Sequence, residues 1–135
     1  MLPMLSYEGV AEAAAFAATA FGFRETGRWS DEQGRVTHVN LEHAGSAIMF
    51  GWPGPGYRSP RHHAEGCEIA RAWSETPYVV DGVLVYVDDV DAHFEIARAA
   101  GAAILSPLED NIDVGQRQYR AEDPEGHRWM FAQPI

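Results

Sequence analysis

The segment "RHHAEGCE" holds side chains that can bind a transition metal. If it is helical, His62, His63, Cys67 and Glu68 fall within one or two turns, and the i, i+4 spacing of His63 and Cys67 could ligate zinc. No second cluster elsewhere in the chain completes such a site. We therefore predict a structural role for the segment, and whether His62, His63 and Cys67 bind a metal stays open.

Other side chains are of the types that move protons or hold anions. His38 and Tyr119 are candidate proton carriers, and Arg128 could hold an anionic group. Each also has a structural interpretation: His38 as a hydrogen-bonded strand residue, Tyr119 as a core aromatic with a satisfied hydroxyl. Arg117 and Arg128 could equally pair with acidic residues at the sheet rim, namely Glu122 or Asp123. Because each candidate also has a structural interpretation, we assign no catalytic residue from the sequence alone.

Composition limits the possible functions. The chain has 135 residues, 46% of them hydrophobic and 22% charged, which is typical of one globular domain. The net charge of −10 disfavours nucleic acid and acidic membrane surfaces as partners. Cys67 is the only cysteine, so no intramolecular disulfide can form. The apolar run near the start contains Glu12, lacks a basic leader and is too short to span a bilayer, so we expect a cytoplasmic protein.

The first half of the chain reads as strand, helix and three strands. We predict a helix over 10–21, because alanine favours helices and apolar residues recur on one face, and Gly22 ends it. Strands are predicted at the ranges 1–7, 23–29, 35–43 and 46–52, with a turn at 43–46 between the last two.

The second half repeats this order. A β-forming run at 82–87 precedes a helix over 89–101, with Asp88 or Asp89 as N-cap and Gly101 just beyond its end. Three further strands are expected at 102–107, 116–123 and 127–133.

The two halves match at an offset of about 80 residues. This offset places Gly45 on Gly126, and the segments "GSAIMF" and "GHRWMF" then bring Met49 onto Met130. Two unrelated halves with glycines in chance agreement are the alternative. The repeat indicates a duplicated βαβββ module.

With "AFGF", "VYVDDVDAHFEIARAAGA" and "RQYRAEDPEGHRWMF", this duplication resembles the vicinal oxygen chelate superfamily, which includes glyoxalase I, extradiol dioxygenases and bleomycin resistance proteins. The resemblance covers nearly the whole chain except about 52–80. It implies an α+β fold in which two βαβββ modules form a curved sheet around a cavity, with helices on the outer face. We expect a single domain over 1–135, with one module at about 1–51, a connection at about 52–80 and a second module at about 81–135.

Metal-dependent members of this superfamily use four ligands, one on the first and one on the last strand of each module. By resemblance, the last-strand places fall on Met49 and Met130, and the first-strand places near Met1 or Leu2 and Gly82 or Val83. None offers an oxygen or nitrogen donor for a divalent ion. A thioether pair could suit Cu(I), but methionine is far more often a pocket filler. We therefore predict no metal and no cofactor.

Strand alternation then predicts which side chains line the cavity. If Met49 and Met130 face it, Arg128 should as well, whereas Trp129 and Phe131 should pack under the helices. A hairpin about 44–45 would place Asn40 opposite Met49. The full predicted ligand-binding set is His38, Asn40, Met49, Trp52, Arg117, Tyr119, Arg128 and Met130.

The proline-rich connection at about 52–80 is predicted to hold one short helix and to serve as a lid or dimer element. Trp52, Tyr57 and Trp73 could supply aromatic surface at the cavity mouth. The leading functional prediction is a small-molecule binding protein of the bleomycin-binding type, which sequesters an antibiotic or metabolite and forms a homodimer. The alternatives are a metal-independent lyase or isomerase, with His38 or Tyr119 in an acid–base pair, and a vestigial cavity on a protein-interaction subunit.

Overall fold

A computed structural model describes residues 1–78 and 81–135 and divides into two compact units, Met1–Ser59 and Pro60–Ile135. The last two residues of the predicted 52–80 connection therefore lie outside the described residues. Each unit contains a helix and a four-stranded mixed sheet in the order βαβββ. The predicted α+β fold with a duplicated module is confirmed. No helix of the described residues has the length and apolar character needed to cross a membrane.

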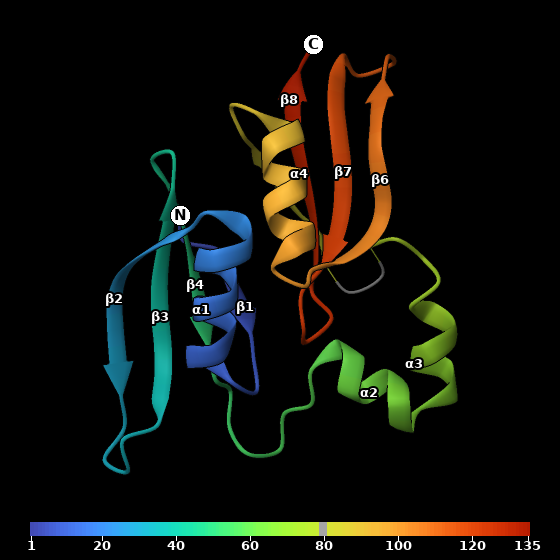
Figure 1. The fold of residues 1–135 in the computed structure, drawn as a ribbon. Helices are drawn as coiled ribbons and strands as arrows, with labels where there is room; N and C mark the ends of the chain where they lie inside the picture. The colour runs from blue at the N-terminus through green and yellow to red at the C-terminus, as the bar shows by residue number, and fades with distance from the viewer. Residues whose placement is uncertain (79–80) are drawn as a thin grey trace. The chain divides into compact units, whose positions relative to one another are not determined.

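The first unit is one βαβββ module (Figure 1). Its sheet has the order β1-β4-β3-β2, in which β1 runs parallel to β4 and the other pairs are antiparallel. The elements are β1 (Met4–Ser6), α1 (Val10–Phe21), β2 (Arg24–Ser30), β3 (Val36–His43) and β4 (Ser46–Gly51).

Helix α1 covers one face of this sheet. Its buried face is made mostly of alanines, whose small side chains let the helix lie close to the strands. Gly22 ends it in the left-handed conformation at φ 77°, as predicted. Beneath the helix, Val39, Leu41 and Phe50 are fully or almost fully buried. The opposite face of the sheet has no helix of its own unit across it, and we call it the open face of the first sheet.

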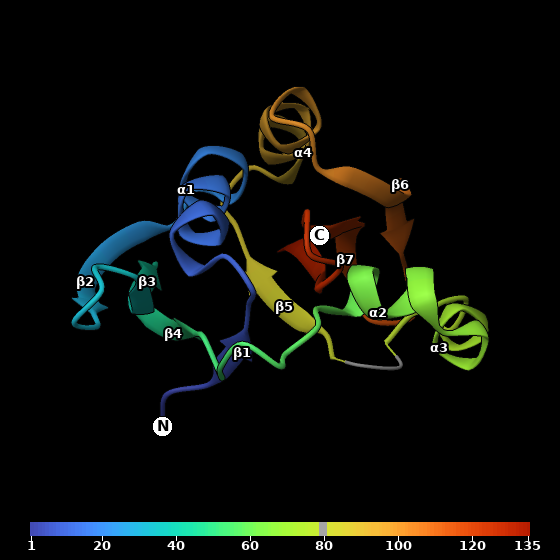
Figure 2. The ribbon, with the colours of Figure 1, turned by 90° about the horizontal axis from the view of Figure 1, so that it is seen from below.

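The second unit repeats the module after two short helices. Its sheet has the order β5-β8-β7-β6, again with the first and last strands parallel, and α4 lies on one side of the strands (Figure 2). The elements are α2 (Pro60–Gly66), α3 (Glu68–Trp73), β5 (Val83–Tyr86), α4 (Val90–Ala99), β6 (Ala103–Asn111), β7 (Gln116–Glu122) and β8 (Arg128–Pro134).

The core of the second unit lies between α4 and the sheet. Trp129, Phe131 and Tyr119 are fully buried there, which confirms that Trp129 and Phe131 pack on the helix side. Phe94 of α4 contacts Tyr119 edge to face, with the ring centroids 5.1 Å apart. Asp89 caps α4 by accepting a hydrogen bond from the backbone N–H of Ala92, one of the two predicted caps.

The Asp-Pro-Glu-Gly turn between β7 and β8 is held by the carboxylate of Asp123. Its Oδ1 accepts hydrogen bonds from the backbone N–H groups of Glu125 and His127, at 3.1 and 3.0 Å. Its Oδ2 accepts from the indole N–H of Trp129 at 3.2 Å. The turn also carries the start of α2, because the N–H of Arg61 donates to the carbonyl of Glu125 at 3.0 Å.

Substitution of Gly126 by alanine should destabilise the protein more than the same change at Gly115. Both glycines have positive φ, 95° and 69°, so a side chain costs about 1–2 kcal/mol at either position. At Gly126 an added Cβ would also lie only 2.7 Å from the backbone nitrogen of Arg61, whereas nothing lies within 4 Å at Gly115. We expect a loss of about 3 kcal/mol for Gly126→Ala and about 1 kcal/mol for Gly115→Ala in urea unfolding. Equal losses would show that the turn does not hold α2.

Candidate functional site

The open face of the first sheet brings three of the predicted residues together. Asn40 of β3 is the direct cross-strand partner of Met49 of β4, and His38 is the partner of Gly51. Val39 lies between His38 and Asn40, Phe50 follows Met49, and both are buried under α1. The side chains of His38, Asn40 and Met49 therefore project from the opposite face of the sheet. Their ligand-binding role stays a prediction, but their common location is a property of the strand register.

Two further residues on this face were missed from the sequence. Trp29 of β2 is the cross-strand partner of His38, and Met4 of β1 is the partner of Met49. Trp29 is 51% exposed and Met4 is 61% exposed, so both present apolar surface to solvent. An added Cβ on Gly27 would lie 2.9 Å from the Trp29 ring. The outer end of the indole therefore lies close to Gly27, which itself pairs with Asn40.

Asn40 has an unsatisfied acceptor on this face. Its Oδ1 is buried and accepts no hydrogen bond from the described residues. A buried carbonyl without a donor costs about 1–3 kcal/mol, so a ligand donor that reached it would recover part of that cost. Beside it, Nδ1 of His38 lies 3.0 Å from the hydroxyl of Thr37, which orients the imidazole. The face thus combines thioether and indole surface with a buried amide oxygen that has no donor among the described residues.

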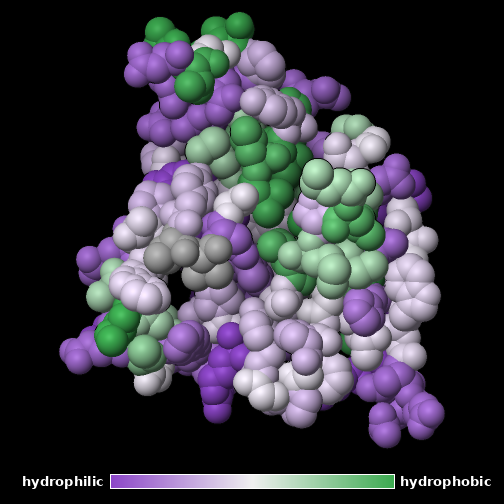
Figure 3. Space-filling view, turned by 180° about the vertical axis from the view of Figure 1, so that it is seen from behind, coloured by the Kyte–Doolittle hydropathy of each residue, from purple (hydrophilic) through white to green (hydrophobic). Residues whose placement is uncertain are grey.

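The open face of the second sheet, opposite α4, is more polar at its centre. Met130 lies between Leu84 of β5 and Arg120 of β7, its cross-strand partners. Its sulfur is 3.8 Å from the amide nitrogen of Gln116, which also donates to Gln118. Leu84 is 47% exposed, and the view from behind shows hydrophobic side chains exposed among hydrophilic ones (Figure 3). The two sheets therefore differ in the chemistry of their open faces.

The predicted facing of Tyr119 and Arg117 is wrong. Tyr119 pairs with Phe131, and cross-strand partners share a face, so Tyr119 points toward α4 and is fully buried. Its hydroxyl lies 2.7 Å from Nδ1 of His93. Arg117 also points to the helix side, where it donates to Asp91 at 2.8 Å and to Asp110 at 3.0 Å. These hydrogen bonds, the one to Asp91 most, raise the pKa of Arg117.

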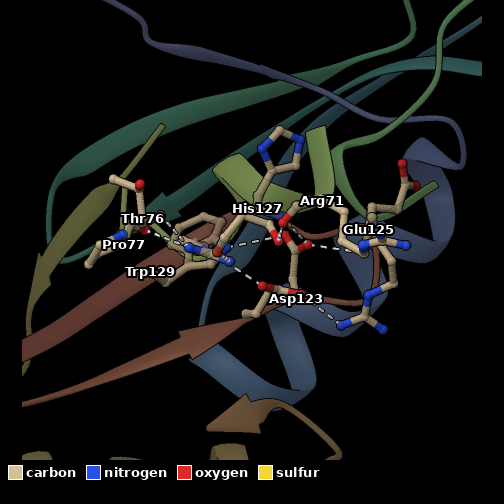
Figure 4. Close-up of polar contacts among 11 residues, drawn as sticks. Arg71, Thr76, Pro77, Asp123, Glu125, His127 and Trp129 are labelled. Carbon is tan, nitrogen blue, oxygen red and sulfur yellow. Dashed lines mark hydrogen bonds and ion pairs between the residues drawn. The ribbon is translucent and has the colours of Figure 1, made fainter. Parts of the chain in front are cut away.

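Arg128 takes part in a structural network. Its guanidinium donates to the backbone carbonyls of Thr76 and Pro77, at 2.7 and 3.1 Å, and to that of Ser74 (Figure 4). It also donates to Glu122 at 3.1 Å, one of the two rim partners considered from the sequence. The guanidinium is therefore occupied in tying the segment after α3 to β8.

Trp52 does not join the open face of the first sheet. The guanidinium of Arg35 lies 4.2 Å from the centre of its ring, and its backbone N–H donates to Thr37. Gly51 pairs with His38 of the open face, so strand alternation directs the side chain of Trp52 to the face opposite His38. The predicted cavity position of Trp52 is therefore wrong.

The predicted single helix around His63 and Cys67 is also corrected. Helix α2 ends at Gly66 and α3 begins at Glu68, with Cys67 in extended backbone conformation at φ −141°. His63 and Cys67 therefore do not share a continuous helix, and the i, i+4 argument for zinc does not apply.

Burial raises the pKa of the Tyr119 phenol far above its usual value of about 10. The unfolded chain should release this proton first, so the stability contribution is complete below about pH 10 and is lost as the pH rises beyond it. We expect Tyr119→Phe to leave the absorbance change at 295 nm between about pH 8 and pH 11 unaltered. A reduction with Tyr119→Phe would contradict the buried placement.

The residues present do not fit the divalent metal that the superfamily resemblance implies. Met49 and Met130 occupy the last-strand places, and their neighbours on the first strands are Met4 and Leu84, a little further along the chain than predicted. None of these four side chains offers an oxygen or nitrogen donor. Within residues 1–78 and 81–135, no group of three or more His, Cys, Asp or Glu side chains could hold a metal ion.

Comparison with known proteins agrees with the observed fold. Residues 4–131 match the model of the Glyoxalase/Bleomycin resistance protein/Dioxygenase superfamily. The protein Mb0911c of Mycobacterium bovis is 31% identical over 137 residues, covering 98% of this chain and 82% of Mb0911c. The crystal structure of TioX from Micromonospora sp. ML1 is 32% identical, with a TM-score of 0.72 and coverage of 100% of this chain and 95% of TioX.

A more distant structure, TnmS3 from Streptomyces sp. CB03234, is described as an antibiotic binding protein. It is 19% identical to this chain and has a TM-score of 0.67, with coverage of 100% of this chain and 96% of TnmS3. At that identity the likeness shows a shared fold only.

Proposed function

Because this chain belongs to the glyoxalase/bleomycin resistance protein/dioxygenase superfamily, we propose that it binds a small molecule on the open face of the first sheet and acts by sequestering it. The Oδ1 of Asn40 carries the proposal, because it accepts no hydrogen bond within residues 1–78 and 81–135 and lies beside Trp29 and Met49. Ligand sites combine apolar walls with a few polar groups that fix orientation. The ligand is expected to be largely apolar and to carry an N–H or O–H donor.

The binding step follows from the position of Trp29. The outer end of its indole lies close to Gly27, and Gly27 is the cross-strand partner of Asn40. A planar ligand that takes the place of the indole over Gly27 would bring its donor to the Asn40 carbonyl. The displaced indole can then stack on the ligand, since Trp29 is already 51% exposed.

An antibiotic or another natural product is the ligand class we favour. TnmS3 supports this class, as an antibiotic binding protein that has the same fold. The acid–base alternative is weakened because Tyr119 lies under α4 and Arg128 is committed to Glu122 and three backbone carbonyls. We retain a cytoplasmic homodimer in the proposal, since the edge strands β2 and β6 each leave one row of backbone groups that a two-fold partner could cover.

A thermal-shift screen of antibiotics and metabolites tests the proposal. A ligand at about 100 times its Kd should add roughly 2.7 kcal/mol to the stability of the folded protein. For the best hit, Asn40→Ala should weaken binding about 10-fold, the equivalent of one hydrogen bond. Gln33→Ala, an exposed amide in the turn between β2 and β3, should bind like wild type. Ligands whose affinity is unchanged by Asn40→Ala would refute the site. An absence of hits would favour the protein-interaction alternative.

A further inference from the structure

The second unit contains a cavity of about 460 Å³, whose lining includes Glu122 and Arg128 at one end of the open face of its sheet. It lies between the two short helices and the turn that joins β7 to β8. This volume is within the range of small-molecule sites. The residues lining it are Pro60, Arg61, His63, Ala64, Glu65, Ala70, Arg71, Trp73, Ser74, Asp81, Glu122, Gly126 and Arg128.

Hydrogen bonds hold the walls of this cavity in place. Arg128 binds the carbonyls of Ser74, Thr76 and Pro77 after α3. At the other helix, Arg61 pairs with Glu122 at 2.9 Å, and its backbone N–H binds the β7–β8 turn. Helix α2 is thus tied to β7 and the β7–β8 turn, and the segment after α3 is tied to β8, so these contacts hold the cavity walls without a ligand.

Asp81 supplies an acceptor that the protein does not use fully. Its Oδ2 accepts one hydrogen bond, from Nδ1 of His127 at 2.7 Å. Its Oδ1 is buried and accepts none from the described residues. A carboxylate offers about four acceptor positions, so several remain after the bond to His127. The other deeply placed acid of the lining, Glu122, is already paired with Arg61 and Arg128.

The remaining lining favours an organic cation with an apolar body. Trp73 is 60% exposed and offers an aromatic face, which attracts ammonium groups as well as apolar ones. Glu65 adds a second acid, which forms no ion pair within the described part of the chain, whereas Arg71 lies 3.7 Å from Glu68.

We propose that this cavity is a second binding site, which takes a small arylalkyl or alkyl amine as its ammonium ion. The ammonium donates to the carboxylate of Asp81, and the apolar part of the ligand lies against Trp73. The site is independent of the open face of the first sheet, so either can exist without the other.

Titration with 2-phenylethylamine, followed by amide and indole NMR shifts, tests the proposal. A fragment of this size is expected to bind with a Kd of about 1 mM and to shift the Trp73 indole signal. Asp81→Asn keeps an acceptor for His127 but removes the charge, and it should weaken binding at least about 10-fold. Glu75→Gln makes the same charge change at an exposed position outside the lining and should leave binding unchanged.

Two related compounds separate charge from apolar contact. 2-Phenylethanol has the same apolar body without the cation and should bind at least about 10-fold more weakly, and 3-phenylpropionate should bind more weakly still. Equal affinity for the amine and the alcohol would overturn the proposal. So would full binding by Asp81→Asn, preference for the anion, or no shift of Trp73 at about 10 mM amine.

Discussion

Replacing Asp123 with alanine is expected to lower the free energy of unfolding by about 3–5 kcal/mol, measured by urea denaturation. The carboxylate satisfies two backbone N–H groups of its own turn and the indole N–H of Trp129, and Trp129 is fully buried. Alanine would leave these donors without their acceptor in the protein interior. The turn also receives the start of α2, so the loss should extend to the wall of the second cavity.

Asp113→Ala is the matched control. Asp113 is an exposed aspartate in the other hairpin turn of the same unit, between β6 and β7. Its substitution should change stability by less than about 0.5 kcal/mol. A loss below about 1 kcal/mol for Asp123→Ala would show that the carboxylate is not the organising group of its turn.

Met49→Glu should abolish ligand binding on the open face of the first sheet, with a loss of at least about 100-fold in affinity. Met49 is half-buried and lies directly opposite Asn40, so a carboxylate here would have to be desolvated under a bound apolar ligand. Partial exposure lets the new charge reach water in the free protein, so the fold should survive.

Met49→Leu is the companion variant, because it keeps apolar volume and removes only the sulfur. Its affinity should stay within about threefold of wild type. If Met49→Glu bound the ligand as well as wild type while keeping its circular dichroism spectrum, the ligand would have to lie elsewhere.

The sequence was sufficient to predict the architecture, because the two halves repeat one pattern and each supports the same order of strands and helix. Gly45 and Gly126 occupy equivalent turns, and both have positive φ, so the alignment of the halves reflects backbone geometry. Alternation along β8 also correctly separated Trp129 and Phe131 from Met130. Successive side chains of a strand point to opposite faces of the sheet, so the face of one residue fixes the faces of the others in a regular strand.

Pairing between strands was the step that sequence alone did not determine. A one-residue error in the register of β7 against β8 moves Arg117 and Tyr119 to the wrong face, and turn length alone did not reveal it. In β2, an irregularity between Glu25 and Gly27 shifts the alternation. That shift places Trp29 on the face of Asn40, and no facing was predicted for the strand at 23–29.

The site in the second unit depends on contacts between distant segments. Asp81 and His127 are 46 positions apart, and no local pattern predicts their hydrogen bond. Arg128 was predicted as a ligand residue, but its role depends on carbonyls more than 50 positions earlier in the chain. Such long-range pairs arise from the packing of α2 and α3 and carry no local sequence pattern.

The most direct measurement is an NMR titration of the protein with the best ligand from the thermal-shift screen, following the Trp29 indole and the Asn40 side-chain amide signals. Ligand binding on the open face of the first sheet predicts that both signals shift saturably, with one Kd, and that Met49→Glu abolishes the shifts. Saturable binding that leaves Trp29 and Asn40 unchanged and shifts only other residues, such as Trp73, would contradict it.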